Sequence, residues 1–215
     1  MIQIDTLVFN SFQVNTYLVW DETRNCLVVD PAFYSREERA FFENHISKKG
    51  LKLTGQINTH CHVDHILGVH HVKVHYGCPF RAHADEAKLV NNAPMMGDVF
   101  GLSVEPFTGI DQTIDDKEII HVGNQILHSI HVPGHSPGSL AYYSKEGGFV
   151  ITGDALFQGS IGRTDLPGGD YDQLIQSIRT RLLVLPPETV VYAGHGPPST
   201  IGYEISENPF LTMSQ

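Results

Sequence analysis

The chain has 215 residues and a formal net charge of −10, from 24 acidic and 14 basic side chains. This charge disfavours a nucleic-acid partner, because phosphates are held by clustered Lys and Arg and the sequence shows no such cluster. No stretch has the length of an apolar membrane span, and the N-terminus lacks the basic and apolar regions of a signal peptide, so we expect no membrane partner.

A chain of this length buries one substantial core, so we expect a single domain over residues 1–215, as a monomer or a small homo-oligomer. Its three cysteines, Cys26, Cys61 and Cys78, have neither the spacing of a disulfide framework nor that of a CxxC motif. This pattern favours a reducing, cytoplasmic location.

The first half of the chain has the pattern of a strand–helix–strand unit. We expect, in order, strands at 2–9, 14–20 and 26–29, a helix at 35–50, and a strand at 53–59. Ser35 and Glu38 form a capping box, and Gly50 is typical of a helix end. A right-handed crossover between parallel strands then places the residues after 59 at the carboxyl end of a strand, where α/β sheets bind ligands.

The segment 58–65, Asn-Thr-His-Cys-His-Val-Asp-His, follows that strand directly. In an extended segment, side chains two residues apart face the same way, so His60, His62 and Asp64 are expected to converge. His65 begins a turn or helix that directs its ring to the same pocket. Imidazole and carboxylate ligands suit zinc, and also iron or manganese. A chance group of surface histidines is the weaker interpretation, because the lead-in is typical of a buried strand.

After this cluster, the pattern predicts further helices and strands and one long loop. We expect a helix at 66–76, a strand at 79–83, a brief helix at 85–90, and a long loop at 91–111, where periodicity is lost. The later elements expected are strands at 119–122, 125–132, 139–143, 148–152 and 189–193, and a helix at 170–182. The recurrence of both element types indicates two strand-rich halves with helices outside.

Three of the later strands lead into one more candidate ligand each, directly after a glycine: His135, Asp154 and His195. Any one of them alone is more typical of an ordinary turn, but three in the same setting indicate ligands. The seven candidate ligands are enough for two metal sites of three ligands each, with one carboxylate shared between the two sites. His60, His62 and His135 form the first site; Asp64, His65 and His195 form the second; and Asp154, with two oxygens, bridges them.

These residues, written His60-x-His62-x-Asp64-His65, His135, Asp154 and His195, resemble the ligand set of the metallo-β-lactamase superfamily over nearly the whole chain. The resemblance implies an α/β fold (α+β in some schemes), an αββα sandwich with two central mixed sheets flanked by helices. Segments 133–138, 152–157, 160–169 and 194–197 are similar to those of glyoxalase II and its compact single-domain relatives.

The resemblance implies a thioester hydrolase of the S-2-hydroxyacylglutathione type, with two divalent metals, a metal-bridging hydroxide as nucleophile, and a small-molecule thioester as its partner. Zinc is the expected metal, with iron or manganese as alternatives, and Asp64 orients or deprotonates the attacking water. The helical domain that supplies glutathione-binding residues in typical glyoxalase II enzymes is not matched, so the carrier thiol stays open. The alternatives are a persulfide dioxygenase with one iron on His60, His135 and Asp154, and a metal-binding module without turnover.

Several other residues have two interpretations each. Arg163 either anchors a substrate carboxylate or pairs with Asp165 or Asp170, and the structural pairing is favoured. Asp30 is either a turn residue or an acceptor that orients a ligand imidazole. Core packing is expected for Cys61, and surface or supporting roles for His70, His71 and His75. Met95 and Met96 either line an apolar substrate wall or simply pack in the loop, and packing is favoured.

Overall fold

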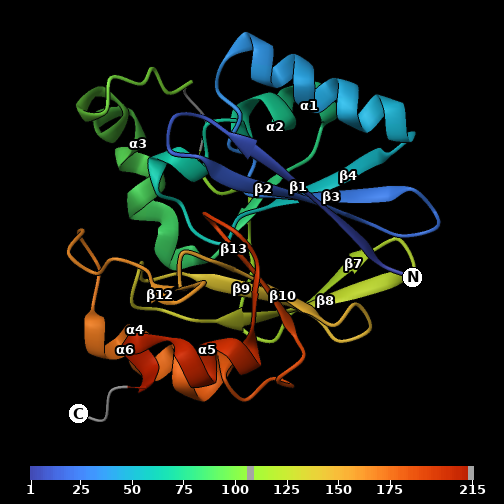
Figure 1. The fold of residues 1–215 in the computed structure, drawn as a ribbon. Coiled ribbons are helices and arrows are strands. Elements are labelled where there is room, and N and C mark those ends of the chain that lie inside the picture. Colours follow the sequence, from blue (N-terminus) through green and yellow to red (C-terminus); the bar gives the residue numbers. More distant parts are fainter. Residues whose placement is uncertain (106–108, 213–215) are drawn as a thin grey trace.

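The computed structural model describes residues 1–105 and 109–212 (Figure 1). Most of its strands form two six-stranded mixed sheets that pack face to face, with helices on both outer faces. This is the αββα arrangement of the α/β class that the sequence predicts. In the described part of the chain, no helix is both long enough and apolar enough to cross a membrane.

The first sheet combines an antiparallel and a parallel half. Its strands, in spatial order, are β1 (Gln3–Phe9), β2 (Val14–Trp20), β3 (Asn25–Val29), β4 (Lys52–Ile57), β5 (Phe80–Ala82) and β6 (Gln112–Thr113). The strands from β1 to β3 are antiparallel, and those from β3 to β6 are parallel. Helices α1 (Arg36–Lys49) and α2 (Val69–Tyr76) lie over its outer face (Figure 1). The predicted capping box of α1 is present, with Gly50 left-handed at its end.

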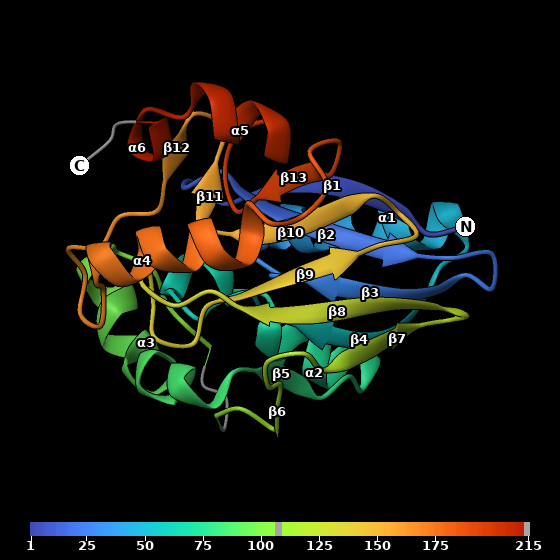
Figure 2. The same ribbon diagram turned by 90° about the horizontal axis from the view of Figure 1, so that it is seen from below.

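The second sheet is antiparallel except for one pair of strands. Its order is β14 (Ser199–Thr200), β13 (Val190–Ala193), β10 (Phe149–Gly153), β9 (Leu140–Ser144), β8 (Gln125–His131) and β7 (Ile119–Val122). Only β10 and β13 are parallel. Its outer face is covered by α4 (Tyr171–Ser177), the π-helical turn Ile178–Leu182, α5 (Ile201–Glu207) and α6 (Pro209–Thr212) (Figure 2). A small ribbon of β11 (Leu156–Phe157) and β12 (Ser160–Ile161) follows β10.

Side chains that alternate between the two faces of the buried strands form the separate apolar cores of the molecule. In β2, Tyr17 and Val19 join the core between the sheets, whereas Leu18 and Trp20 join the core beneath α1. A third core lies between the second sheet and α4, around Leu174. Because side chains alternate along a strand, a strand between two apolar layers is apolar on both faces.

One prediction about this part of the chain is wrong. The loop expected at 91–111 is helical as far as Val99, in helix α3 (Ala87–Val99), which follows a 3-10 turn at Ala84–Glu86. Pro94 lies inside this helix and has no N–H for the carbonyl of Val90. The helix forms because Val90, Ala93 and Gly97, at helical spacing, are buried on one face, and packing overrides the local signal. Residues 100–105 and 109–111 are irregular as predicted, and 106–108 lie outside the described residues.

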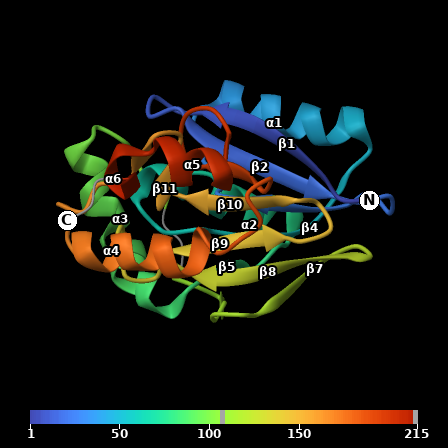
Figure 3. The ribbon, with the colours of Figure 1, turned by 60° about the horizontal axis from the view of Figure 1, so that its bottom comes forward.

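Helix α3 lies at the end of the molecule opposite the N-terminus, which is the end where α4 and α6 also lie (Figure 3). It contacts the 3-10 turn Val63–His65, which carries part of the histidine cluster. The fold therefore brings a helix that was predicted only as far as residue 90 against the candidate site.

Candidate metal centre

Four strands deliver the predicted ligands to one place. After β4 the chain leaves the sheet, so the cluster lies on an irregular segment and a 3-10 turn at Val63–His65 rather than on the extended strand end that was predicted. Strands β8, β10 and β13 lead to the other three ligand candidates. Backbone hydrogen bonds tie these loops together across the two sheets: Leu140 N–H donates to Thr59 O (2.8 Å) and Asn15 N–H to Gly194 O (2.7 Å).

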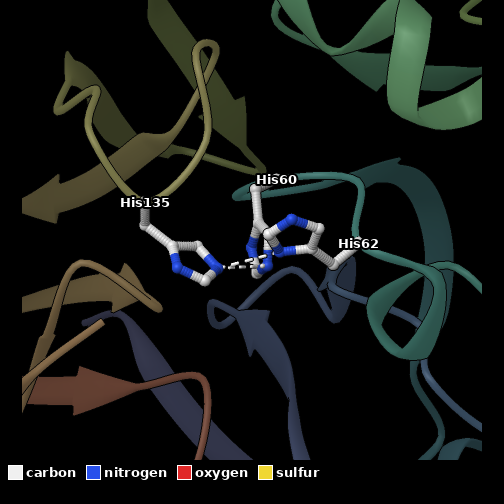
Figure 4. Close-up of side chains that lie close together, drawn as sticks. All are labelled: His60, His62 and His135. Carbon is white, nitrogen blue, oxygen red and sulfur yellow. Dashed lines mark hydrogen bonds between the residues drawn. The ribbon is translucent and has the colours of Figure 1, made fainter. Parts of the chain in front are cut away.

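The first group of side chains consists of His60, His62 and His135, whose rings point at a common centre (Figure 4). His135 Nε2 lies 2.9 Å from His62 Nδ1 and 3.3 Å from His60 Nε2. Burial, and then the neighbouring imidazoles, lowers the pKa of His60 well below its usual value and that of His62 to about 3. Burial also lowers the pKa of His135. The rings are therefore neutral, and converging lone pairs of neutral imidazoles are what a metal cation requires.

The second group consists of Asp64, His65 and His195. His65 Nε2 lies 3.3 Å from His195 Nε2, and Asp64 Oδ2 lies 3.7 and 3.6 Å from these two nitrogens. Burial opposes protonation of His65, but the carboxylates of Asp154 and Asp64 outweigh it and raise its pKa to about 10. This high pKa records how strongly the group attracts positive charge, which a metal ion would supply in place of the proton.

Asp154 lies between the two groups. Its Oδ1 is 3.4 Å from His65 Nε2, and its Oδ2 is 3.7 Å from His135 Nε2 and 3.5 Å from His195 Nε2. Although burial alone would raise it, the pKa of Asp154 is far below its usual value because of the adjacent His65 and His195. Its buried Oδ1 has no hydrogen-bond partner. A Cβ at Gly194 would collide with this carboxylate, so the glycine before His195 is required by space.

In three of the imidazoles, a hydrogen bond at Nδ1, on the side of the ring away from the centre, fixes the position of the Nδ1 proton. The Nδ1–H of His135 donates to Arg163 O (2.8 Å), that of His195 to Phe12 O (2.9 Å), and that of His65 to Asp30 Oδ2 (3.1 Å). Each bond holds Nδ1 away from the centre and turns Nε2 toward it, as in metal sites whose ligands are oriented by carboxylates and carbonyls.

Asp30 has both of the roles that the sequence left open. It is a turn residue in the left-handed region, with φ of 51°. Its buried carboxylate also accepts hydrogen bonds from Thr59 N–H and Thr59 Oγ1–H, both at 2.6 Å, besides the one from His65. It therefore fixes the segment before the cluster and orients a candidate ligand.

Glu86 is a supporting residue that the sequence did not single out. Its fully buried carboxylate accepts hydrogen bonds from Cys61 N–H (2.6 Å), Ser136 Oγ–H (2.8 Å) and Gly138 N–H (2.8 Å). It thus joins the loop that carries His60 and His62 to the loop that carries His135. No local pattern marks this glutamate, because its partners are distant in the sequence.

The structure also places the other residues for which the sequence offered a role. Arg163 is exposed and makes a bidentate pair with Asp165 at 2.8 and 2.7 Å, the structural pairing that the sequence favoured. Cys61 is buried among apolar side chains, as predicted. His71 pairs with Glu43 (2.9 Å) between α1 and α2, outside the two ligand groups. For Met95 the less favoured interpretation holds, because this side chain is 59% exposed and lines the cavity that also contains candidate ligands.

Two similarities to known proteins identify the family of this chain. The model of the metallo-beta-lactamase superfamily matches residues 10–195. The hydroxyacylglutathione hydrolase GloC of Haemophilus influenzae is 36% identical over 212 residues, which cover 98% of each chain. The chain belongs to the metallo-β-lactamase superfamily. A probable metallo-hydrolase of Bacillus subtilis, YqgX, is also 36% identical, over 93% of this chain and 92% of its own.

Solved structures of this superfamily share the whole fold. The structure of BLEG-1 B3 metallo-beta-lactamase has a TM-score of 0.89 and 30% identity, covering 98% of this chain and 100% of that one. That of TTHA1623 in a di-iron-bound form has a TM-score of 0.86 and 34% identity, with 96% and 100% coverage. ETHE1 from Myxococcus xanthus has a TM-score of 0.79 and 27% identity, with 99% and 86% coverage. Membership of the superfamily, with the relatives GloC and YqgX named as a hydrolase and a probable metallo-hydrolase, supports a metal-dependent hydrolase.

Proposed function

We propose that this metallo-β-lactamase-superfamily chain hydrolyses thioesters of the S-2-hydroxyacylglutathione type with two divalent metal ions. The observation that carries the proposal is the pair of three-residue ligand groups, with one carboxylate, Asp154, in contact with both. The similarity to a hydrolase named for hydroxyacylglutathione supports the thioester as substrate.

The residues present fit two metal ions. Imidazole and carboxylate are ligands of zinc, iron and manganese, and the unpartnered Oδ1 of Asp154 is a buried acceptor that needs a cation. His60, His62 and His135 would hold one ion, and Asp64, His65 and His195 the other, with Asp154 between them. When bound, the metals supply an activated water at neutral pH and a Lewis acid for the thioester carbonyl. We propose zinc for both positions, and the di-iron form of TTHA1623 makes iron the alternative.

The protein side chains have separate parts in the proposed reaction. Asp30, Phe12 and Arg163 hold three imidazoles by their Nδ1–H groups and so fix the direction of each Nε2. Asp64 lines the cavity, where it would accept the proton of the attacking water or orient it. Water supplies OH to the acyl carbon and a proton to the sulfur as the carbon–sulfur bond breaks. A thiolate leaves readily, so no strong general acid is required.

This proposal is tested on one preparation of the purified protein. We expect metal analysis to find close to two divalent ions per chain, and S-lactoylglutathione to be hydrolysed without oxygen uptake. Oxygen uptake with glutathione persulfide, one iron per chain and no thioester loss would instead identify the dioxygenase alternative. Bound metal with neither activity would overturn the proposed activity and favour the module without turnover or a different substrate.

A further inference from the structure

The candidate metal centre forms the floor of a cavity of about 330 Å³ whose walls are largely apolar. Met95 and Met96 of α3 line it, and Phe100 lines it just beyond the end of that helix. Phe12, from the turn between β1 and β2, and Leu166, from the loop after β12, add further apolar surface. The volume is at the lower end of the range for small-molecule sites.

Part of this apolar surface lies open to solvent. Met95 is 59% exposed and Phe100 is 48% exposed, although both line a cavity above buried polar groups. The Phe12 and Phe100 rings pack edge to face with centroids 5.4 Å apart. Water leaves these exposed apolar side chains when an apolar group covers them, and this burial lowers the free energy of the complex.

Charged anchors are scarce in the same cavity. Of the described residues that line it, Arg163 is the only arginine or lysine. Its guanidinium is already engaged by both carboxylate oxygens of Asp165. The cavity therefore suits an apolar group better than a peptide-like group with several carboxylates.

A second cavity, of about 440 Å³, shares Asp154, Arg163 and His195 with the first. Its other lining residues are the polar Gln158 and Ser160 and, beside them, Phe157, Gly196 and Pro197. A thioester has two arms, one on each side of its carbonyl. With the carbonyl at the metal centre, one arm fits the apolar cavity and the other fits the second cavity.

We propose that the apolar cavity binds the acyl arm of the thioester, and that the preferred acyl group carries an apolar chain longer than that of lactoyl. The thiol arm, which is polar in glutathione-type carriers, lies toward Gln158 and Ser160. This inference rests on the proposed thioester hydrolysis and adds the substrate class to it.

The test uses two substrate series with the metal-loaded full chain. The first varies the acyl group from acetyl to hexanoyl on one small neutral thiol, N-acetylcysteamine. The second keeps acetyl and lengthens an alkyl thiol by the same steps. We expect kcat/KM to rise about fourfold for each methylene of the acyl series, which corresponds to about 0.8 kcal/mol, and about 200-fold in total. The thiol series should change by less than about threefold, on the same scale.

Each other outcome has a distinct meaning. A flat acyl series with intact thioester turnover overturns the inference and leaves the proposed function standing. A slope in the thiol series alone also overturns it, because the apolar arm is then the carrier. Absence of any thioester hydrolysis by the metal-loaded protein overturns the proposed function, and this inference with it.

Variants of α3 locate the effect in the cavity. The double variant Met95→Gln, Met96→Gln should lower the hexanoyl-to-acetyl ratio of kcat/KM by about tenfold, since it replaces apolar wall with amides. Val99→Thr is the matched control, because Val99 is 70% exposed on the same helix and does not line the cavity. An unchanged ratio in the double variant overturns the inference. Met95→Gln alone, at an exposed position, keeps the test open if the double variant fails to fold.

Discussion

Asp154→Ala should lose at least one metal ion per chain and nearly all turnover. Two cations about 3.5–4 Å apart repel each other by about 4 kcal/mol for each pair of unit charges at an effective dielectric constant of 20. Asp154 is the carboxylate in contact with both ligand groups, so its removal leaves that repulsion without its nearest counter-charge. Metal analysis and thioester turnover on the same preparation measure the result.

His195→Ala is the matched comparison for Asp154→Ala. It removes a ligand of the second group only, and the first group, with Asp154, stays complete. We therefore expect it to weaken the second metal and to retain the first. Both variants are compared at matched circular dichroism. Two metals and near-native activity in Asp154→Ala would show that the assignment of seven ligands is wrong.

Glu86→Ala should lower the free energy of unfolding by at least about 2 kcal/mol. The substitution leaves Cys61 N–H and Gly138 N–H without their buried acceptor, and each buried unsatisfied donor costs about 1–3 kcal/mol, whereas Ser136 Oγ keeps its hydrogen bond with Ser139 Oγ. Denaturant unfolding of the metal-free protein measures this effect. In the metal-loaded protein, the two ligand loops are no longer joined through the Glu86 carboxylate, so metal affinity should fall about 10- to 100-fold in competition with a chelator.

Asp85→Ala is the control for the effect of Glu86, since it removes the neighbouring carboxylate, which is 60% exposed. Its free energy of unfolding should stay within about 0.5 kcal/mol of the wild-type value. If Glu86→Ala were equally mild, Glu86 would not be the residue that holds the two loops together.

The fold was largely predictable, because its main signals are local. The capping box at Ser35 and the apolar strands define the layers, and both are read from neighbouring residues. Helix α3 was not predictable beyond residue 90, since Pro94 and the nearby glycine argue against a helix in the sequence alone. Its stability comes from burial of Val90 and Ala93 against other parts of the chain, which local pattern does not contain.

The candidate ligands were predictable because each follows a strand end and belongs to a residue type that binds metals. The structure brings all seven together in the predicted groups. The supporting contacts were not predictable, since Glu86 and Phe12 act on residues 25 to 183 positions away. An apolar wall at Met95 was the less favoured of two interpretations, because the part of α3 that places this residue at the site was not predicted.

We propose that these seven side chains hold two metal ions that act together on a thioester. Titration of zinc into the metal-free protein, with bound metal and S-lactoylglutathione hydrolysis followed in the same sample, tests it most directly. We predict that binding saturates at two ions per chain and that activity reaches its plateau only as the second ion binds. Saturation of both binding and activity at one ion per chain would contradict the claim.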